Sequence, residues 1–418
     1  ALGSQFARSV LVAALCLLAT RRANAYRTTI SPIIGLGFDA QTLDHTRPRS
    51  FTEPCYGQKC GDVFSKSGPL IIMGNNQSPL GAFPQLQATA EYIVHLQRPN
   101  GAIPWFSGGI TDPWDHIEAM MGLTVHGEWS KAVAALQWLA DRQRSDGAWY
   151  AAYNETGIAD DSRAETNFVA YVATGLWHYF TITGERKVLE AFWPMVDRAM
   201  HFVLAQQTAD GEIYWAVDKH QGPSKDALIT GCSSIYKSLE CALNISLELN
   251  QPRGAWQIAR QRLGNAIRNH PELFDRTWAS KARYSMDWFY PILGGVLTGD
   301  VAQQRLLKRW DTFVKPGFGC RCVADQPWVT VAESCELVMA CMAADLPNHA
   351  RQIFDDIAQH QLVDGSWWTG YVFNDGVYWP DERPTWTSAA VLLAADALHH
   401  FTPGASLFAS VPDTLEHP

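Results

Sequence analysis

From residue 85 onward, apolar residues recur at intervals of three and four positions, the spacing that places them on one face of an α-helix. Two kinds of helical segment alternate. The first kind is amphipathic with a charged face, and is predicted at roughly 85–97, 130–143, 187–206, 253–269, 301–313 and 348–360. The second kind is richer in small and apolar residues, as expected of an enclosed helix, and is predicted at roughly 115–126, 164–182, 230–249, 287–297, 333–345 and 386–400. The pattern therefore predicts six helical hairpins.

The connections between these helices are of two lengths. Each apolar helix is followed by a short turn with Gly or Pro, such as Thr183-Gly184-Glu185 or Leu346-Pro347. Each amphipathic helix is followed by a long loop rich in Trp, Tyr, Gly and acids, and long loops inside a compact domain are usually functional. Because the two kinds of helix alternate, every long loop emerges on the same face. We expect an all-α fold, an (α/α)6 toroid of six helical hairpins, whose working site is a bowl built from these loops.

Four of the long loops open with one repeated phrase. The Asp-Gly or Asn-Gly pair in it supplies the left-handed turn that ends a helix, and the aromatic residue that follows can fold back onto the ring. We interpret the repeat as a structural motif that by itself indicates no particular reaction. Its copies run from Gln97 to Trp105, from Gln143 to Trp149, from Gln207 to Trp215 and from Gln361 to Trp367.

Gln-x-x-Asp-Gly-x-Trp repeats that close the helices of a six-hairpin array resemble two families with an α/α toroid. One is the six-hairpin glycosidases, such as glucoamylase-like enzymes, and the other is the terpene cyclase and prenyltransferase superfamily. The stretch from Thr183 to Leu204, followed by Gln207 and Asp210-Gly211, is similar to the outer helix of the glucoamylase type. The resemblance covers residues ~85–400, and it specifies the fold well and the reaction poorly.

Motif tests separate the two families in part. The chain has no Asp-x-Asp-Asp acid of the triterpene cyclases, because Asp160-Asp161 lacks the preceding acid. It has no Asp-x-Cys of the zinc-dependent protein prenyltransferases and no Asp-Asp-x-x-Asp motif. What remains is acids and aromatics, the composition of a sugar site: aromatic faces stack on the C–H faces of pyranose rings, and paired carboxylates hydrolyse glycosidic bonds.

Composition and charge exclude other classes. The chain of 418 residues is 47% hydrophobic and 18% charged, carries a formal net charge of −9 and has no basic run, so we expect no nucleic-acid partner. It contains no HExxH, no Cys-x-x-Cys and no His pair at metal-ligand spacing. We therefore expect neither a metal site nor another cofactor.

The first part of the chain does not follow the helical pattern. An apolar run at 9–19 with a small-residue cleavage site at 23–25 is typical of a secretory signal, although Arg21-Arg22 also fits an organelle transit peptide. The run is too short to span a bilayer, so we expect no stable membrane insertion. A secreted or periplasmic location is favoured, organelle and cytoplasmic locations stay open, and the sequence leaves the oligomeric state undetermined. The predicted organisation is a signal or transit segment at 1–25, an irregular extension at 26–84, a toroid domain at 85–400 and a tail at 401–418.

Acids at the starts of the apolar helices are the candidate catalytic residues. Alternatively, Asp115 or Asp112 is simply the N-cap of its helix, with Glu118 completing a capping box, and Ser162 with Glu165 forms another capping box. Glu336 continues into an apolar helix, where a buried acid needs a partner or has the raised pKa that a general acid of glycoside hydrolysis requires. The predicted catalytic acids, of which one would protonate the leaving oxygen and another activate water, are Asp115, Glu165, Asp287 and Glu336.

Aromatic and polar residues near these acids are the candidate saccharide ligands. Arg383 has the guanidinium that could hold a carboxylate or phosphate group, and its loop could alternatively pack its own aromatics as a lid. The predicted substrate-binding residues are Trp105, Trp114, Asn167, Trp215, Trp288, Tyr290, Trp328, Glu333, Trp367, Trp368, Tyr371, Arg383 and Trp386.

The sequence thus favours a carbohydrate-active enzyme, a glycoside hydrolase that acts on a saccharide or other small molecule through paired carboxylates in the central cavity. A terpene cyclase or prenyltransferase relative acting on an isoprenoid is the first alternative, and it predicts a deep aromatic cavity with few acids. The second alternative is a non-catalytic ring that binds a glycan or a protein partner on its loop face.

Overall fold

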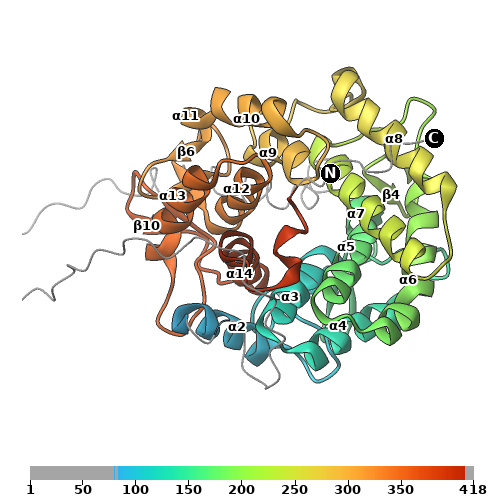
Figure 1. Cartoon of the computed structure of the whole chain (residues 1–418), viewed down its shortest axis with the longest axis horizontal. Coiled ribbons are helices and arrows are strands. Elements are labelled where there is room, and N and C mark those ends of the chain that lie inside the picture. Colours follow the sequence, from blue (N-terminus) through green and yellow to red (C-terminus); the bar gives the residue numbers. More distant parts are fainter. Residues whose placement is uncertain (1–79, 81–82, 410–418) are drawn as a thin grey trace, which may run out of the picture. The chain divides into compact units, whose positions relative to one another are not determined.

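A closed ring of inner helices forms the centre of the fold. The computed structural model describes residue 80 and residues 83–409, so the predicted segment at 1–25 and nearly all of the extension at 26–84 lie outside the described residues. Neighbouring inner helices pack against each other in chain order, and the last packs against the first (Figure 1). These helices are α3 (Pro113–His126), α5 (Thr166–Thr183), α7 (Ile229–Glu248), α9 (Ser285–Leu293), α12 (Val331–Ala343) and α14 (Thr385–His399).

The outer helices surround this ring. Each packs on the inner helix that precedes it in the chain, and α2 packs on α14. The predicted (α/α)6 toroid is confirmed, with the long connections at the N-terminal ends of the inner helices. The outer helices are α2 (Pro84–Leu96), α4 (Trp129–Arg142), α6 (Arg186–Leu204), α8 (Gly254–Asn269), α10 (Gly299–Lys308) and α13 (Pro347–Ile357), and the shorter turns are η1 (Pro271–Leu273), α11 (Trp310–Phe313), η2 (Ala358–His360) and η3 (Pro403–Ser406).

Small residues let the inner helices approach each other closely. A Cβ at Gly122 of α3 would press on Ala389 of α14, and a Cβ at Gly175 of α5 would press on Ile117 of α3. The inner helices are therefore enclosed on most sides, which explains why they are apolar around most of their circumference. No helix in the described part of the chain is long and apolar enough to cross a membrane.

Short antiparallel strands pair within the long loops. The largest sheet has the order β10-β9-β8-β7-β6, and its strand β8 leads directly into α12. Val329 is the central residue of β8 and lies between Arg321 on one neighbouring strand and Tyr371 on the other. The strands are β1 (Ala152–Asn154), β2 (Gly157–Asp160), β3 (Arg163–Glu165), β4 (Ala216–Asp218), β5 (Gly222–Pro223), β6 (Val314–Lys315), β7 (Gly319–Arg321), β8 (Trp328–Thr330), β9 (Gly370–Val372) and β10 (Val377–Tyr378).

The repeated Gln residues tie neighbouring outer helices together. Nε2 of Gln143, at the end of α4, donates to the carbonyl of Gly147 at 2.8 Å and to that of Met195 on α6 at 2.9 Å. Nε2 of Gln207 donates in the same way to Ala259 on α8 at 2.9 Å. The other two repeats bridge Gln97 to Lys131 on α4 and Gln361 to Gln85 on α2, so the last outer helix is bonded to the first.

The glycine of each repeat allows this close approach. Gly147 has a φ of +91°, which favours glycine, and a Cβ there would clash with the backbone carbonyl of Arg198 on α6. The same restrictions apply to the equivalent glycines Gly101, Gly211 and Gly365. The Asp-Gly or Asn-Gly turn is therefore required by the contact with the next helix as well as by the end of its own helix.

The repeats differ in the residue that fills the core. The position six residues after the Gln is buried in all four repeats. It is Trp in the two short repeats and Ile in the two long repeats, where the Trp follows two residues later and is half-buried. The core residues are Ile103, Trp149, Ile213 and Trp367, and the half-buried ones are Trp105 and Trp215.

After α14 the chain turns into the centre of the ring. Thr402 donates its backbone N–H and its hydroxyl to the two carboxylate oxygens of Asp396, at 2.8 and 2.6 Å. The η3 turn then packs on α5 and α14, and Figure 1 shows this dark red segment inside the ring. Gly404 lies against His178 in the C-terminal half of α5, away from the long loops.

Candidate active site

A small cavity lies among the inner helices. Five of the six helices contribute the residue at their sixth position, and the equivalent residue of α14 is Ala390. Residues one turn deeper and Phe408 of the C-terminal segment complete the wall. The sixth-position residues are Glu118, Tyr171, Ser234, Tyr290 and Glu336, and the deeper ones are Lys237, Leu293, Gly294, Met339 and Phe408.

Two acids of the cavity are each hydrogen-bonded to a tyrosine. The hydroxyl of Tyr171 donates to Oε2 of Glu118 at 2.7 Å, and the hydroxyl of Tyr290 donates to Oε1 of Glu336. Burial raises the pKa of Glu118 to about 7, although the bond from Tyr171 lowers it. Burial and the charge of Glu118 raise the pKa of Glu336 well above its ordinary value, against the bond from Tyr290. The two carboxyls therefore hold fewer than two negative charges near neutral pH.

Asp115 lies one turn nearer the loops, at the third position of α3. Its backbone N–H donates to Oδ1 of Asp112, the N-cap, at 3.0 Å, and the two carboxyl groups share a further hydrogen bond. Nε1 of Trp105 donates to the other oxygen of Asp112 at 2.6 Å. Burial raises the pKa of Asp115 well above its ordinary value, and the charges of Asp112, Glu118 and Glu336 raise it further. Asp115 and Glu336 thus belong to one interacting group of acids.

Trp114 lies beside this group. Its ring centroid is 5.8 Å from that of Tyr171 and 6.2 Å from that of Tyr290, the two tyrosines that bond the cavity acids. Trp114 is half-buried, so part of its surface is accessible next to the acids. An aromatic face in this position suits the apolar side of a sugar ring.

Asp287 occupies the third position of α9, across the ring from α3, and its surroundings differ. Burial and the charge of Asp275 raise its pKa to about 6. Arg305, Arg309 and Lys281 lower the pKa of Asp287. The charged groups that act on this acid therefore lie in the loop before α9 and on the outer side of the ring, where Arg305 also donates to the carbonyl of Asp287 at 3.0 Å.

Glu165 forms a buried ion pair at the end of β3. A guanidinium nitrogen of Arg163 lies 2.6 Å from its Oε1, and the two side chains are 10% and 1% exposed. Glu165 is itself the N-cap of α5 and makes no side-chain cap bond, so the capping box suggested for Ser162 and Glu165 is wrong. The carboxylate is engaged with Arg163 outside the wall of the cavity.

Three predicted binding residues, Trp288, Trp328 and Trp367, lie in apolar clusters. Each is buried and donates its indole N–H to an oxygen of the protein. They do not line the cavity. Their packing is sufficient to explain their presence.

The last long loop packs its aromatics on one another. The rings of Trp368 and Tyr378 are stacked at 4.9 Å with an interplanar angle of 14°, and the Arg383 guanidinium lies 5.1 Å from the Trp368 ring. Tyr371 lies 5.1 Å from Tyr378. This arrangement matches the alternative in which the loop is a self-packed lid.

Four other predicted residues lie near the N-terminal ends of inner helices. Asn167 and Trp386 are the second residues of α5 and α14, and Glu333 is the third residue of α12. Burial raises the pKa of Glu333. The indole nitrogens of Trp386 and Trp215 are buried and have no hydrogen-bond partner among the described residues.

The sequence reasoning did not select Glu118, Tyr171 or Lys237 as site residues. The alternative in which Glu118 completes a capping box with Asp115 is wrong, because Asp112 is the N-cap of α3 and Glu118 lies in the cavity, where it accepts a hydrogen bond from Tyr171. Lys237 lines the deeper wall and bonds Oε1 of Glu240 at 2.7 Å. The signal that could have found two of them is the sixth position of each apolar helix, counted from the end of the preceding loop.

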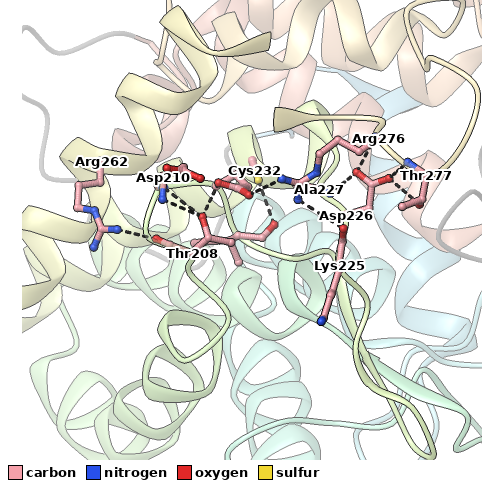
Figure 2. Close-up of polar contacts among 12 residues, drawn as sticks. Thr208, Asp210, Lys225, Asp226, Ala227, Cys232, Arg262, Arg276 and Thr277 are labelled. Carbon is pink, nitrogen blue, oxygen red and sulfur yellow. Dashed lines mark hydrogen bonds and ion pairs between the residues drawn. The ribbon is translucent and has the colours of Figure 1, made fainter. Parts of the chain in front are cut away.

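A polar network fixes the loops that lead into α7 and α9 (Figure 2). Asp226 is buried and accepts from the backbone N–H groups of Ala227, Arg276 and Thr277 and from the Thr277 hydroxyl. Arg276 also forms an ion pair with the buried Glu212 at 3.0 Å. Because Asp226 precedes α7 and Thr277 precedes α9, the network joins the entrances of two neighbouring inner helices.

The acids described above contact tyrosine, tryptophan, arginine and one another. In residues 83–409, no group of three or more His, Cys, Asp and Glu side chains is arranged to hold a metal ion. Carboxyl groups in such surroundings can transfer protons to and from a substrate.

Comparison with known proteins identifies the family. No protein-family profile matches the chain. The MMP endo-(1,4)-3-O-methyl-alpha-D-mannosidase of Mycolicibacterium hassiacum is 48% identical over 327 residues, which span 78% of this chain and 89% of that enzyme. The chain belongs to the family of this mannosidase. It is a carbohydrate-active enzyme of the glycoside hydrolase kind, which confirms the function predicted from the sequence.

Solved structures of sugar enzymes share the fold of this chain. A wild-type glycosidase is 15% identical with a TM-score of 0.61, over 75% of this chain and 96% of that chain. A D-mannose isomerase is 10% identical with a TM-score of 0.57, over 77% and 98%. A sugar epimerase from a ruminal bacterium is 12% identical with a TM-score of 0.58, over 75% and 98%. At such identities the likeness shows the fold alone, and the predicted relation to terpene cyclases stays a prediction.

Proposed function

We propose that this enzyme hydrolyses a glycosidic bond with Asp115 as the general acid and Glu336 as the general base. The observation that carries the proposal is that both acids are partly exposed and that the charge of Glu336 raises the pKa of Asp115. Glu118, Glu333 and Asp287 are buried and so are less accessible to a substrate.

Asp115 is suited to donate a proton. Its pKa is raised by burial and by the neighbouring Asp112, so the carboxyl is protonated while Asp112 accepts its hydrogen bond. When a substrate binds beside Trp105 and Trp114, the proton passes from Asp115 to the glycosidic oxygen as the bond to the anomeric carbon breaks. Asp115 is left ionised and regains its proton from solvent.

Glu336 is suited to accept a proton from water. The Tyr290 hydroxyl bonds Oε1 and favours the ionised carboxylate, and the small cavity beside it has polar groups for a water molecule. The water attacks the anomeric carbon from the cavity side and gives its proton to Glu336. While Glu336 is ionised, its charge raises the pKa of Asp115 and so keeps the proton there. Burial and the charge of Glu118 raise the pKa of Glu336 itself, which makes its carboxylate a stronger acceptor for the proton of the water.

The proposed substrate is a polymer of α-(1→4)-linked 3-O-methylmannose. The support is the 48% identity to an enzyme named for endo cleavage of that linkage. The half-buried rings of Trp105 and Trp114 near the acids also suit a sugar with an added apolar methyl group. The isoprenoid alternative predicts few acids, and the interacting group of Asp112, Asp115, Glu118 and Glu336 weighs against it.

Hydrolysis of α-(1→4)-linked 3-O-methylmannose oligosaccharides, followed by chromatography of the products, tests the proposal. We expect Asp115→Asn and Glu336→Gln each to lower kcat by about 10²- to 10⁴-fold, the usual contribution of a general acid or base. Glu190→Gln on the outer surface of α6 is the control and should leave kcat unchanged.

A second comparison locates the base. Glu333→Gln changes an acid three residues earlier on the same helix, buried beside Thr330 and Cys322. We expect this variant to keep most of its activity. A large loss at Glu333 with full activity in Glu336→Gln would show that the base is assigned to the wrong residue, and full activity in Asp115→Asn would refute the acid.

A further inference from the structure

The loop between α8 and α9 is one of the two long connections that lack the Gln repeat. It has no Gln-x-x-Asp-Gly phrase, yet it carries Trp278, which is half-buried. The ring centroid of Trp278 lies 5.9 Å from that of Trp215, at an interplanar angle of 75°. Trp278 was not among the residues predicted from the sequence.

Hydrogen bonds within the loop hold Trp278 in one place. Nε1 of Trp278 donates to Oδ1 of Asp275 at 2.7 Å, and the backbone N–H of Lys281 donates to the other carboxylate oxygen at 2.6 Å. The residues between them are bonded to the buried Asp226, through Arg276 and Thr277 (Figure 2). Hydrogen bonds to a charged carboxylate are stronger than those between neutral groups, so these contacts hold the segment in place although it lies near the surface.

Trp215 is fixed just as firmly beside it. Its backbone N–H donates to the carbonyl of Asp226 at 3.0 Å, and its carbonyl accepts from the N–H of Thr166 at 2.9 Å. The Arg163 guanidinium lies 5.9 Å from its ring. The indole nitrogen of Trp215 is buried with no hydrogen-bond partner among the described residues, and leaving a buried donor without a partner has a free-energy cost. A hydroxyl group of a ligand would remove that cost.

The two tryptophans lie on the other side of the ring from the acid pair. Trp215 adjoins the start of α5 and Trp278 precedes α9, whereas Asp115 and Glu336 belong to α3 and α12. Helices α3 and α9 are opposite each other in the ring, because each inner helix packs only on its neighbours in the chain order. A chain of sugars that crosses the mouth of the ring would therefore reach both places.

We propose that Trp278, together with Trp215, forms a remote sugar-binding subsite that holds one unit of a glycan chain while another unit of the same chain is cleaved at Asp115 and Glu336. The ligand is a pyranose ring, whose apolar face lies on Trp278 and whose hydroxyl accepts the N–H of Trp215. The inference rests on the proposed function, because the acid pair defines where the chain is cut.

The test is the dependence of hydrolysis on chain length. The probes are a tetrasaccharide and a dodecasaccharide of α-(1→4)-linked 3-O-methylmannose. For Trp278→Ala we expect kcat/KM on the long substrate to fall about tenfold or more, through KM, and kcat/KM on the short substrate to stay within about twofold. Trp278→Phe keeps an aromatic face and should retain most of the activity on the long substrate.

Trp129→Ala, which changes a 41%-exposed tryptophan on α4, is the matched control and should affect neither substrate. The inference is overturned if Trp278→Ala changes both substrates equally or neither of them, or if Trp278→Phe loses as much as Trp278→Ala. If the wild type cleaves neither probe, the proposed function fails instead. Binding of the dodecasaccharide, followed by tryptophan fluorescence in the wild type and in Trp278→Ala, then decides the subsite separately: equal affinities refute it.

Discussion

The two short Gln repeats and the two long ones begin alike and end differently. In the short repeats, Trp149 and Trp367 fill the core six positions after the Gln, and their indole N–H groups bond to Leu139 and Thr89 inside the protein. The contacts of the Gln, the Gly and the Trp in these two repeats can all be explained by packing between neighbouring helices of the ring.

In the long repeats an isoleucine takes the core position and the Trp comes two residues later. Trp105 reaches Asp112 beside the cavity acids, and Trp215 reaches the remote aromatic pair with Trp278. The comparison teaches that one structural motif places its tryptophan in two different surroundings. In a short repeat the Trp fills the core and stabilises the toroid. In a long repeat an isoleucine fills the core position, and the Trp, two residues later, lies at the face where the long loops meet.

The largest effect that tests this comparison is on stability. Trp367→Ala removes a buried tryptophan and should lower the free energy of unfolding by about 3–5 kcal/mol. Trp105→Ala removes a half-buried one and should lower it by roughly 1 kcal/mol, while lowering kcat because Asp112 loses its donor. Urea denaturation and turnover, measured on both variants, check this. Equal losses of stability would mean that the two kinds of repeat do not differ in role.

A smaller effect concerns the acid group. The N–H of Trp105 favours the ionised form of Asp112, and the charge of Asp112 raises the pKa of Asp115. In Trp105→Phe, Asp112 takes up a proton more readily, its charge is smaller, and the pKa of Asp115 falls. Since Asp115 must be protonated to act, the high-pH limb of kcat/KM should move to lower pH, by up to about one unit, which is 1.36 kcal/mol. Trp129→Phe is the control, and an unmoved or upward-shifted limb would contradict the role given to Trp105.

Much of the fold followed from the sequence, because periodicity and loop length act locally. The alternation of charged-face and apolar helices required the long loops to share one face, and the Gln repeat marked the helix ends. The difference between a buried Trp, such as Trp149, and a half-buried Trp, such as Trp105, is also visible in the sequence. The repeat from Gln97 to Trp105 is two residues longer than the repeat from Gln143 to Trp149. That difference was not used, so Trp367 and Trp105 were grouped together.

The site was less predictable, because what an acid does depends on neighbours far away in the chain. Asp115 and Asp287 both stand third in an inner helix, yet Asp115 is surrounded by acids and Asp287 by cations. Glu165 begins a helix like the others, but Arg163 from the same strand binds it. No local pattern separates these cases. Only the closed ring brings Glu336 to Asp115.

The smallest effect expected is at the Gln that begins each repeat. Gln207→Ala removes the bonds of its Nε2 to Gly211 and to Ala259 on α8, and should lower the free energy of unfolding by about 1 kcal/mol. Because Gln207 follows the end of α6 and does not line the cavity, kcat should be unchanged. Gln137→Ala, which removes an exposed bond to Asp141 on α4, is the control and should cost less than about 0.5 kcal/mol in urea denaturation. If Gln207→Ala lowered kcat together with stability, the ring-closing part of a long repeat could not be separated from its Trp, and the two roles assigned to the motif would be one.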